Sequence, residues 1–202
     1  MQIKKYLTAA ILAVVLAGCT QQQPRKPISY SSGTFMKESV ERNKKMIAGE
    51  EAKIDSLIKK DTASDYIASP KGYWYKYDVK STLADTLKPI KGYVAYFDYE
   101  VKDLDGNMIY TEVELRPQKY LVDRQNIMMG LRDGIKLMKK GERITFLFPS
   151  HMGYGYHGDN RRIGHNQPLM TTVFLRDIKP EDVARSEEKK PVSANPKPFT
   201  QE

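Results

Sequence analysis

The sequence is poor in the residues that build disulfides, metal centres and nucleophilic sites. Among its 202 residues there is one cysteine, Cys19, which excludes an internal disulfide and every zinc site made of several thiolates. Three histidines, His151, His157 and His165, share one glycine-rich loop and lack the helical HExxH spacing of zinc enzymes. P-loop and GxSxG motifs are missing as well, so we expect no metal and no cofactor.

Long blocks of one charge are also missing. The 33 Lys and Arg residues outnumber the 25 Asp and Glu residues and give a net charge of +8, but they are scattered as doublets among acids. There is no arginine-rich stripe and no RNA-binding aromatic motif. We therefore expect a solvated surface and no nucleic-acid partner, while a weak attraction to anionic lipid or acidic partners stays open.

The apolar run near the N-terminus is too short to cross a bilayer. Lys4 and Lys5 precede 13 uncharged residues, 6–18, against the roughly 20 that a spanning helix needs. A basic start followed by a short apolar run is typical of a secretory signal peptide. We predict that residues 1–18 are such a signal and are removed.

The run ends in Leu16-Ala17-Gly18-Cys19, which resembles the lipobox of bacterial lipoproteins. The resemblance implies cleavage before Cys19 and acylation of its thiol, and several acyl chains together give stable anchoring. An ordinary secretory signal with an incidental cysteine is the alternative. Residues 19–33 are polar and contain proline, as expected of a flexible tether. Since no acidic cluster follows Cys19, we expect a lipoprotein facing the periplasm, at the outer membrane.

A helical extension is expected over residues 34–68. Apolar residues recur there at spacings of three, four and seven among Glu and Lys, mostly before Asp61. Val40, Ile47 and Ile54 form a short heptad series. We favour packing against the chain's own domain over a dimer seam, because the series is shorter than three heptads.

The remainder predicts an α+β fold. Aromatic and β-branched residues indicate strands, and Asp105-Gly106 is the expected turn of a hairpin. From this pattern we expect a sheet that buries one face against a single short helix. The predicted elements are strands at 73–77, 93–101, 108–110, 143–148 and 170–178, and a helix at 130–139. Residues 181–202 are polar and proline-bearing, and we expect a disordered tail.

A family resemblance is found in residues 130–143, whose sequence is GLRDGIKLMKKGER. This segment resembles the signature G-[WL]-x-x-G-[IV]-x-x-M-x-x-G-x-[RK] of FK506-binding (FKBP-type) peptidyl-prolyl isomerases. Flanking segments agree in order over residues 88–180. The resemblance implies an antiparallel half-barrel of five to six strands around one short helix, within residues 69–180. With the lipobox, the chain is similar to lipoprotein isomerases of Bacteroidetes, a group that includes gliding-motility lipoproteins.

The resemblance also implies a proline pocket. In the family pattern Tyr154 and Tyr99 are pocket tyrosines, the former bonding a substrate carbonyl, and Phe174 contacts the proline ring. Further substrate-binding positions are Tyr120, Ile127, Met128, Leu131, Ile109 and Ile163. For each apolar position a core role is the alternative, since most apolar residues of a half-barrel are core.

Three departures from the family pattern leave two functions open. Tyr110 stands where the family has an aspartate, Gln118 replaces a pocket phenylalanine, and the loop at 158–162 is longer and more charged. One function is an isomerase acting on proline-containing envelope polypeptides. The other is a catalytically weak binding module of an envelope machine for gliding or secretion.

Overall fold

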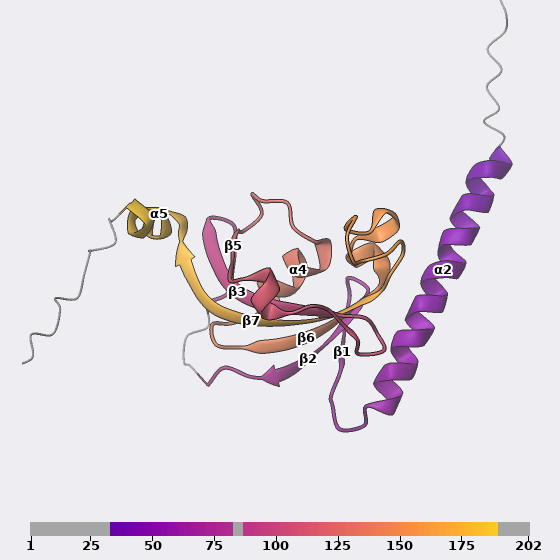
Figure 1. The fold of residues 1–202 in the computed structure, drawn as a ribbon, viewed down its shortest axis with the longest axis horizontal. Helices are drawn as coiled ribbons and strands as arrows, with labels where there is room; N and C mark the ends of the chain where they lie inside the picture. Colours follow the sequence, from indigo (N-terminus) through magenta and orange to yellow (C-terminus); the bar gives the residue numbers. More distant parts are fainter. Residues whose placement is uncertain (1–32, 83–86, 190–202) are drawn as a thin grey trace, which may run out of the picture. The chain divides into compact units, whose positions relative to one another are not determined.

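The computed structural model describes residues 33–82 and 87–189 (Figure 1). The chain divides into two compact units, residues 1–41 and 42–202, and the sheet belongs to the second. The predicted signal peptide, Cys19 and nearly all of the tether lie outside the described residues. Among the helices that are described, none is both long enough and apolar enough to cross a membrane.

Helix α2 (Gly33–Lys60) is the predicted helical extension. It ends before residue 68, because a turn follows Lys60 and strand β1 (Ile67–Ser69) takes up the last of the predicted range. Within the second unit, Ile54 is fully buried, and the carboxylate of Glu50 accepts hydrogen bonds from the Ser150 N–H and hydroxyl, both at 2.8 Å. This turn of the helix therefore packs against the chain's own domain.

The sheet is antiparallel throughout, as predicted. Its order is β1-β2-β6-β7-β3-β4, and β5 pairs with β3 beside β4. The other strands are β2 (Tyr73–Val79), β3 (Tyr93–Lys102), β4 (Met108–Tyr110), β5 (Gln118–Leu121), β6 (Arg143–Phe148) and β7 (Leu169–Pro180). The described part of the chain thus has seven strands instead of five to six, because β1 extends the sheet beyond β2.

The β3–β4 hairpin is confirmed. Val101 lies opposite Tyr110, and Gly106 adopts a φ of +88° that favours glycine. The Asp103 carboxylate accepts hydrogen bonds from the N–H groups of Asp105 (3.0 Å) and Asn107 (2.8 Å), which fixes the turn. The short helix α3 (Glu112–Leu115) follows and is capped by Thr111.

Helix α4 (Met129–Gly134) continues as a 3₁₀ turn, η1 (Ile135–Leu137), so the predicted helix is shorter than 130–139. Leu131, Ile135 and Met138 are buried and pack in one cluster with Phe146 and Phe148 of β6. Figure 1 shows α4 against one side of the curved sheet. The apolar face of this short helix is the centre of the main core.

The prediction of a disordered tail is wrong for residues 181–189, which form helix α5 (Glu181–Lys189). Acidic residues in its first turn suit the positive end of a helix dipole. Ala184 is buried, and Arg124 forms an ion pair with Glu181 at 2.9 Å. These contacts with residues distant in sequence add to the local helix signals of the segment. Residues 190–202 lie outside the described residues.

Candidate active site

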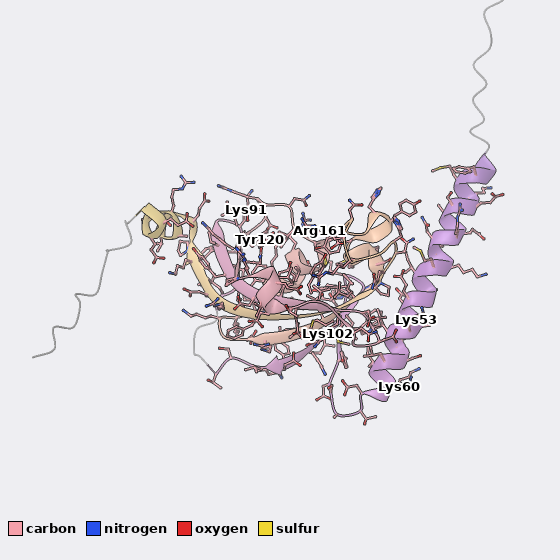
Figure 2. The ribbon with its side chains drawn as sticks, in the orientation of Figure 1. Lys53, Lys60, Lys91, Lys102, Tyr120 and Arg161 are labelled. Carbon is pink, nitrogen blue, oxygen red and sulfur yellow. The ribbon has the colours of Figure 1, made fainter. Side chains whose placement is uncertain are left out.

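A cleft of about 350 Å³ lies between the β3–β4 hairpin and the loop that joins β6 to β7. Tyr99 and Val101 reach it from β3, Tyr110 from β4 and Leu115 from α3. The loop supplies Tyr154, Asp159 and Arg161. Figure 2 labels Arg161 on the same side of the sheet as α4. The structure therefore brings together the two predicted tyrosines, Tyr99 and Tyr154.

The loop is shaped by short local hydrogen bonds. It carries two 3₁₀ turns, η2 (Ser150–Met152) and η3 (Gly155–His157), on either side of Tyr154. The Asp159 carboxylate accepts hydrogen bonds from the N–H groups of Arg161 (2.9 Å) and Ile163 (2.8 Å). At Gly158, with a φ of +65°, a Cβ would lie 2.3 Å from the Ile163 carbonyl oxygen, so only glycine fits this close turn.

The tyrosine hydroxyls of the cleft stay protonated at neutral pH. Burial, with smaller contributions from Tyr154 and Tyr110, raises the pKa of Tyr99 to about 12. Burial and the nearby Asp159 carboxylate also raise the pKa of Tyr154. Both phenols are therefore neutral and can donate hydrogen bonds to a bound carbonyl oxygen.

Tyr110 links the hairpin to the loop. Its hydroxyl donates a hydrogen bond to the Asp159 carboxylate. The Arg162 guanidinium lies 4.9 Å from the centre of the Tyr110 ring and donates to the Ile109 carbonyl oxygen at 2.7 Å. Arg162 also forms an ion pair with Glu114 at 2.7 Å. Two side chains of the loop thus hold it against the hairpin and α3.

Beside the cleft lies a small apolar cluster of Val101, Ile109, Ile163 and Leu169. Tyr99 and Met128 pack against both this cluster and the main core, so they lie between the two. The predicted residues Ile109 and Ile163 therefore support the wall of the cleft. Neither lines the open space itself.

The remaining apolar candidates belong to the main core. Tyr120 and Leu131 are buried, and the Tyr120 hydroxyl accepts a hydrogen bond from the Asp123 N–H at 3.0 Å. Tyr120, labelled in Figure 2, thus has a structural partner for its one polar group. Ile127 and Met128 are partly buried at the edge of the core. At these positions the structure shows the core role that the sequence analysis gave as the alternative to substrate binding.

The structure does not bring Phe174 into the cleft. On β7 the buried residues Val173 and Leu175 belong to the main core, whereas Phe174 lies between them on the opposite face. Its cross-strand neighbours are the charged residues Asp98 and Arg143, and the Arg143 guanidinium lies 5.3 Å from the ring centre. The sequence-based placement of Phe174 against a proline ring is therefore wrong.

Five lining residues were not predicted as site residues: Val101, Tyr110, Leu115, Asp159 and Arg161. Val101 lies two residues after Tyr99 on the same strand, so the period of two places it on the same face and was the available signal. Leu115 had no such signal, because α3 was not predicted. In the described residues no group of three or more side chains is suited to hold a metal ion.

A larger cleft, of about 870 Å³, lies elsewhere in the second unit. Its lining from α2 and the 103–105 turn includes Lys53, Lys60, Asp61, Asp103 and Asp105. It shares no residue with the tyrosine cleft, and five of its eleven lining residues are charged. An apolar proline ring is better matched by the smaller cleft.

Comparison with protein families decides the identity of this domain. Residues 86–176 match the FKBP-type peptidyl-prolyl cis-trans isomerase family over β3 to β7, the segment that builds the cleft. The chain therefore contains an FKBP-type domain. Strands β1 and β2, which complete the sheet of the FKBP-type domain, lie ahead of the matched segment.

Two curated relatives carry the same family name. A probable FKBP-type isomerase FkpA of Neisseria meningitidis serogroup B is 24% identical over 142 residues, covering 70% of this chain and 51% of the relative. A probable FKBP-type isomerase of Haemophilus influenzae is 26% identical over 157 residues, covering 71% of this chain and 62% of the relative. The chain thus spans roughly half to three fifths of the length of these relatives.

Solved structures agree on the fold. FkpA from Escherichia coli superimposes with a TM-score of 0.54 at 22% identity, covering 88% of this chain and 82% of that one. A peptidyl-prolyl isomerase from Pseudomonas syringae pv. tomato gives a TM-score of 0.52 at 18% identity, covering 65% of this chain and 94% of the other. The FKBP-like α+β architecture is thereby confirmed.

Proposed function

We propose that the chain is a peptidyl-prolyl isomerase that binds proline-containing polypeptides in the tyrosine cleft. The observation that carries this proposal is the meeting of Tyr99, Tyr110 and Tyr154 around one concave space in an FKBP-type domain. The cleft offers aromatic faces to a proline ring, and the Tyr99 and Tyr154 hydroxyls can donate hydrogen bonds to the neighbouring carbonyl oxygens.

Such a site suits the reaction because amide rotation needs no nucleophile. The barrier, about 18–20 kcal/mol, comes from the resonance of the planar cis and trans forms, which the twisted form loses. A site that binds the twisted form more tightly than the planar forms lowers this barrier. Neutral tyrosine hydroxyls on the walls of the cleft suit that task, since they need less reorientation than solvent as the amide twists.

We further propose that the domain works at a membrane surface in the periplasm. The support is the Leu16-Ala17-Gly18-Cys19 sequence, which resembles a lipobox, and the polar residues that follow it. An anchored isomerase facing the periplasm, at the outer membrane, would act on envelope proteins whose folding is limited by slow cis–trans isomerisation of proline. Its partners would then be proline-containing polypeptides and the lipid bilayer.

The test of catalysis is NMR exchange between the cis and trans forms of a short Xaa-Pro peptide, with the full chain in detergent micelles. Acceleration that saturates with peptide supports the isomerase. A folded chain that gives no acceleration contradicts it and favours the alternative, a binding module of an envelope machine.

The anchor has its own test in Cys19→Ser. We expect the substituted chain to lose acylation and to leave the membrane fraction. Unchanged acylation and unchanged membrane fractionation of Cys19→Ser contradict the anchor, whatever the outcome of the exchange experiment.

A further inference from the structure

The tyrosine cleft has two walls that come from distant parts of the chain. One wall is the β3–β4 hairpin with α3, and the other is the loop between β6 and β7. The relative position of the two walls sets the width of the cleft. Bonds that cross from wall to wall therefore control how a substrate is held.

One of these crossing bonds joins two residues that both line the cleft. The Tyr110 hydroxyl, on the hairpin, donates a hydrogen bond to the Asp159 carboxylate, on the loop. The other crossing bonds, from Arg162 to the Ile109 carbonyl oxygen and to Glu114, involve groups that do not line the cleft. The Tyr110 to Asp159 bond is thus the crossing contact closest to a bound substrate.

Asp159 is itself held rigidly. Its carboxylate accepts the N–H groups of Arg161 and Ile163, and its own N–H donates to the Ile163 carbonyl oxygen at 3.2 Å. A carboxylate with backbone donors on one side presents its remaining acceptor capacity to Tyr110. The loop therefore holds the negatively charged Asp159 carboxylate in a fixed position against the Tyr110 hydroxyl of the opposite wall.

We propose that Asp159 is a positioning residue for the isomerisation, acting through the Tyr110 hydroxyl to hold the two walls at the separation that grips the substrate. This proposal rests on the proposed function of the cleft. It assigns a role to the longer, charged loop. The Asp159 carboxylate of this loop accepts a hydrogen bond from Tyr110, and Tyr110 stands at the hairpin position where the family pattern has an aspartate.

The kinetic test compares Asp159→Asn, Tyr110→Phe and the double variant, each as the full chain in detergent micelles, with an Xaa-Pro peptide. Because one hydrogen bond to a charged group is lost in each case, we expect KM to rise about ten-fold or more with little change in kcat. The double variant is expected to lose no more than the single variants, because both changes break the same bond.

Two controls separate positioning from loss of structure. Asp103→Asn changes a carboxylate that accepts N–H groups two and four residues on, as Asp159 does, but lies outside the tyrosine cleft, and it should leave kcat and KM unchanged. A partly unfolded variant would lower the apparent kcat without raising KM, because its folded fraction still binds normally.

A spectroscopic readout reports the contact itself. The groups around the Tyr110 phenol are Asp159, Arg162 and Tyr99, and burial together with Asp159 raises its pKa while Arg162 opposes the rise. In Asp159→Asn the pKa of Tyr110, followed by NMR of ¹³Cζ-labelled tyrosine, should fall. Asp103→Asn should leave it unmoved.

The outcomes are distinct. A wild-type chain without exchange catalysis overturns the proposed function and, with it, the catalytic role of Asp159. An active wild-type chain whose KM is unchanged in Asp159→Asn and Tyr110→Phe overturns the positioning role alone. Losses that multiply in the double variant also overturn it, because the two residues would then act separately.

Discussion

A Cβ added to Gly130 would lie 2.5 Å from Cε1 of Phe148, so helix α4 approaches strand β6 as closely as a bare backbone allows. A Cβ added to Gly134, one turn later, would lie 2.8 Å from Cε1 of Phe146. The two glycines of the family signature therefore set the distance between helix and sheet. They place Leu131 and Ile135 in the main core, against which Tyr99 of the cleft also packs.

Gly130→Ala tests this close packing. The added methyl group must displace a buried aromatic ring, and overpacking of this kind costs about 1–3 kcal/mol. We expect the free energy of unfolding to fall by that amount in denaturant titration followed by the fluorescence of the single tryptophan, Trp74. Gly49→Ala is the matched control, because no atom lies within 4 Å of its added Cβ. Equal stability of Gly130→Ala and the wild type would contradict the packing account.

Glu50 gives a second stability prediction. Its buried carboxylate accepts both hydrogen-bonding groups of Ser150, which is itself buried. Glu50→Ala leaves the Ser150 N–H and hydroxyl unpaired, at a cost of about 1–3 kcal/mol in the free energy of unfolding. Glu41→Ala, at an exposed position of the same helix, should change stability little. A loss of the same size in both variants would mean that the contact with Ser150 contributes nothing.

Phe174 separates the two faces of the sheet. Since its ring packs with Arg143 away from the cleft, Phe174→Ala should leave kcat/KM for an Xaa-Pro peptide unchanged. The free energy of unfolding should fall, in part by the roughly 0.5–1 kcal/mol typical of an exposed cation–π pair. A selective loss of activity in a stably folded Phe174→Ala chain would show that the face assignment is wrong.

Glu114 yields a prediction about pH. Its hydrogen bond with Arg162, followed by those from Thr111, lowers the pKa of its carboxyl to about 2. A folded-state pKa below the unfolded value means that the ion pair stabilises the fold fully above pH 4.5, the ordinary value for Glu, and is lost as pH falls through about 2. NMR titration of this carboxyl should show the low pKa in the wild type and a rise toward the ordinary value in Arg162→Gln. A pKa near 4.5 in the wild type would exclude the ion pair in solution.

The sequence predicted the fold well because its signals were local. The aromatic and β-branched residues of β3, the alternation in β6, the Asp105-Gly106 turn and the spacing of Leu131 and Ile135 are all signals between neighbouring residues. Helix α5 was missed because its polar composition is also that of a disordered tail. Its ion pair between Glu181 and Arg124 joins residues distant in sequence, and no local pattern reports it.

The error at Phe174 has a different cause. Val173, Phe174 and Leu175 are all apolar, so alternation does not tell which residue faces the core. The β3–β7 pairing also has a register shift between Tyr96 and Phe97. Because of this shift, knowing which residues of β3 face the core does not tell which residues of β7 do so. The bond between Tyr110 and Asp159 likewise follows from the folded loop, since the two residues are 49 positions apart.

The central claim, that the tyrosine cleft is the site of isomerisation, is tested most directly by Tyr154→Phe. Losing one hydrogen bond of about 0.5–1.5 kcal/mol should lower kcat/KM for a short Xaa-Pro peptide roughly two- to twelve-fold in NMR exchange with the full chain. Tyr156→Phe, whose ring is 70% exposed and outside the cleft, should match the wild type. Wild-type catalysis that persists unchanged in Tyr154→Phe, or that falls equally in Tyr156→Phe, would contradict the account.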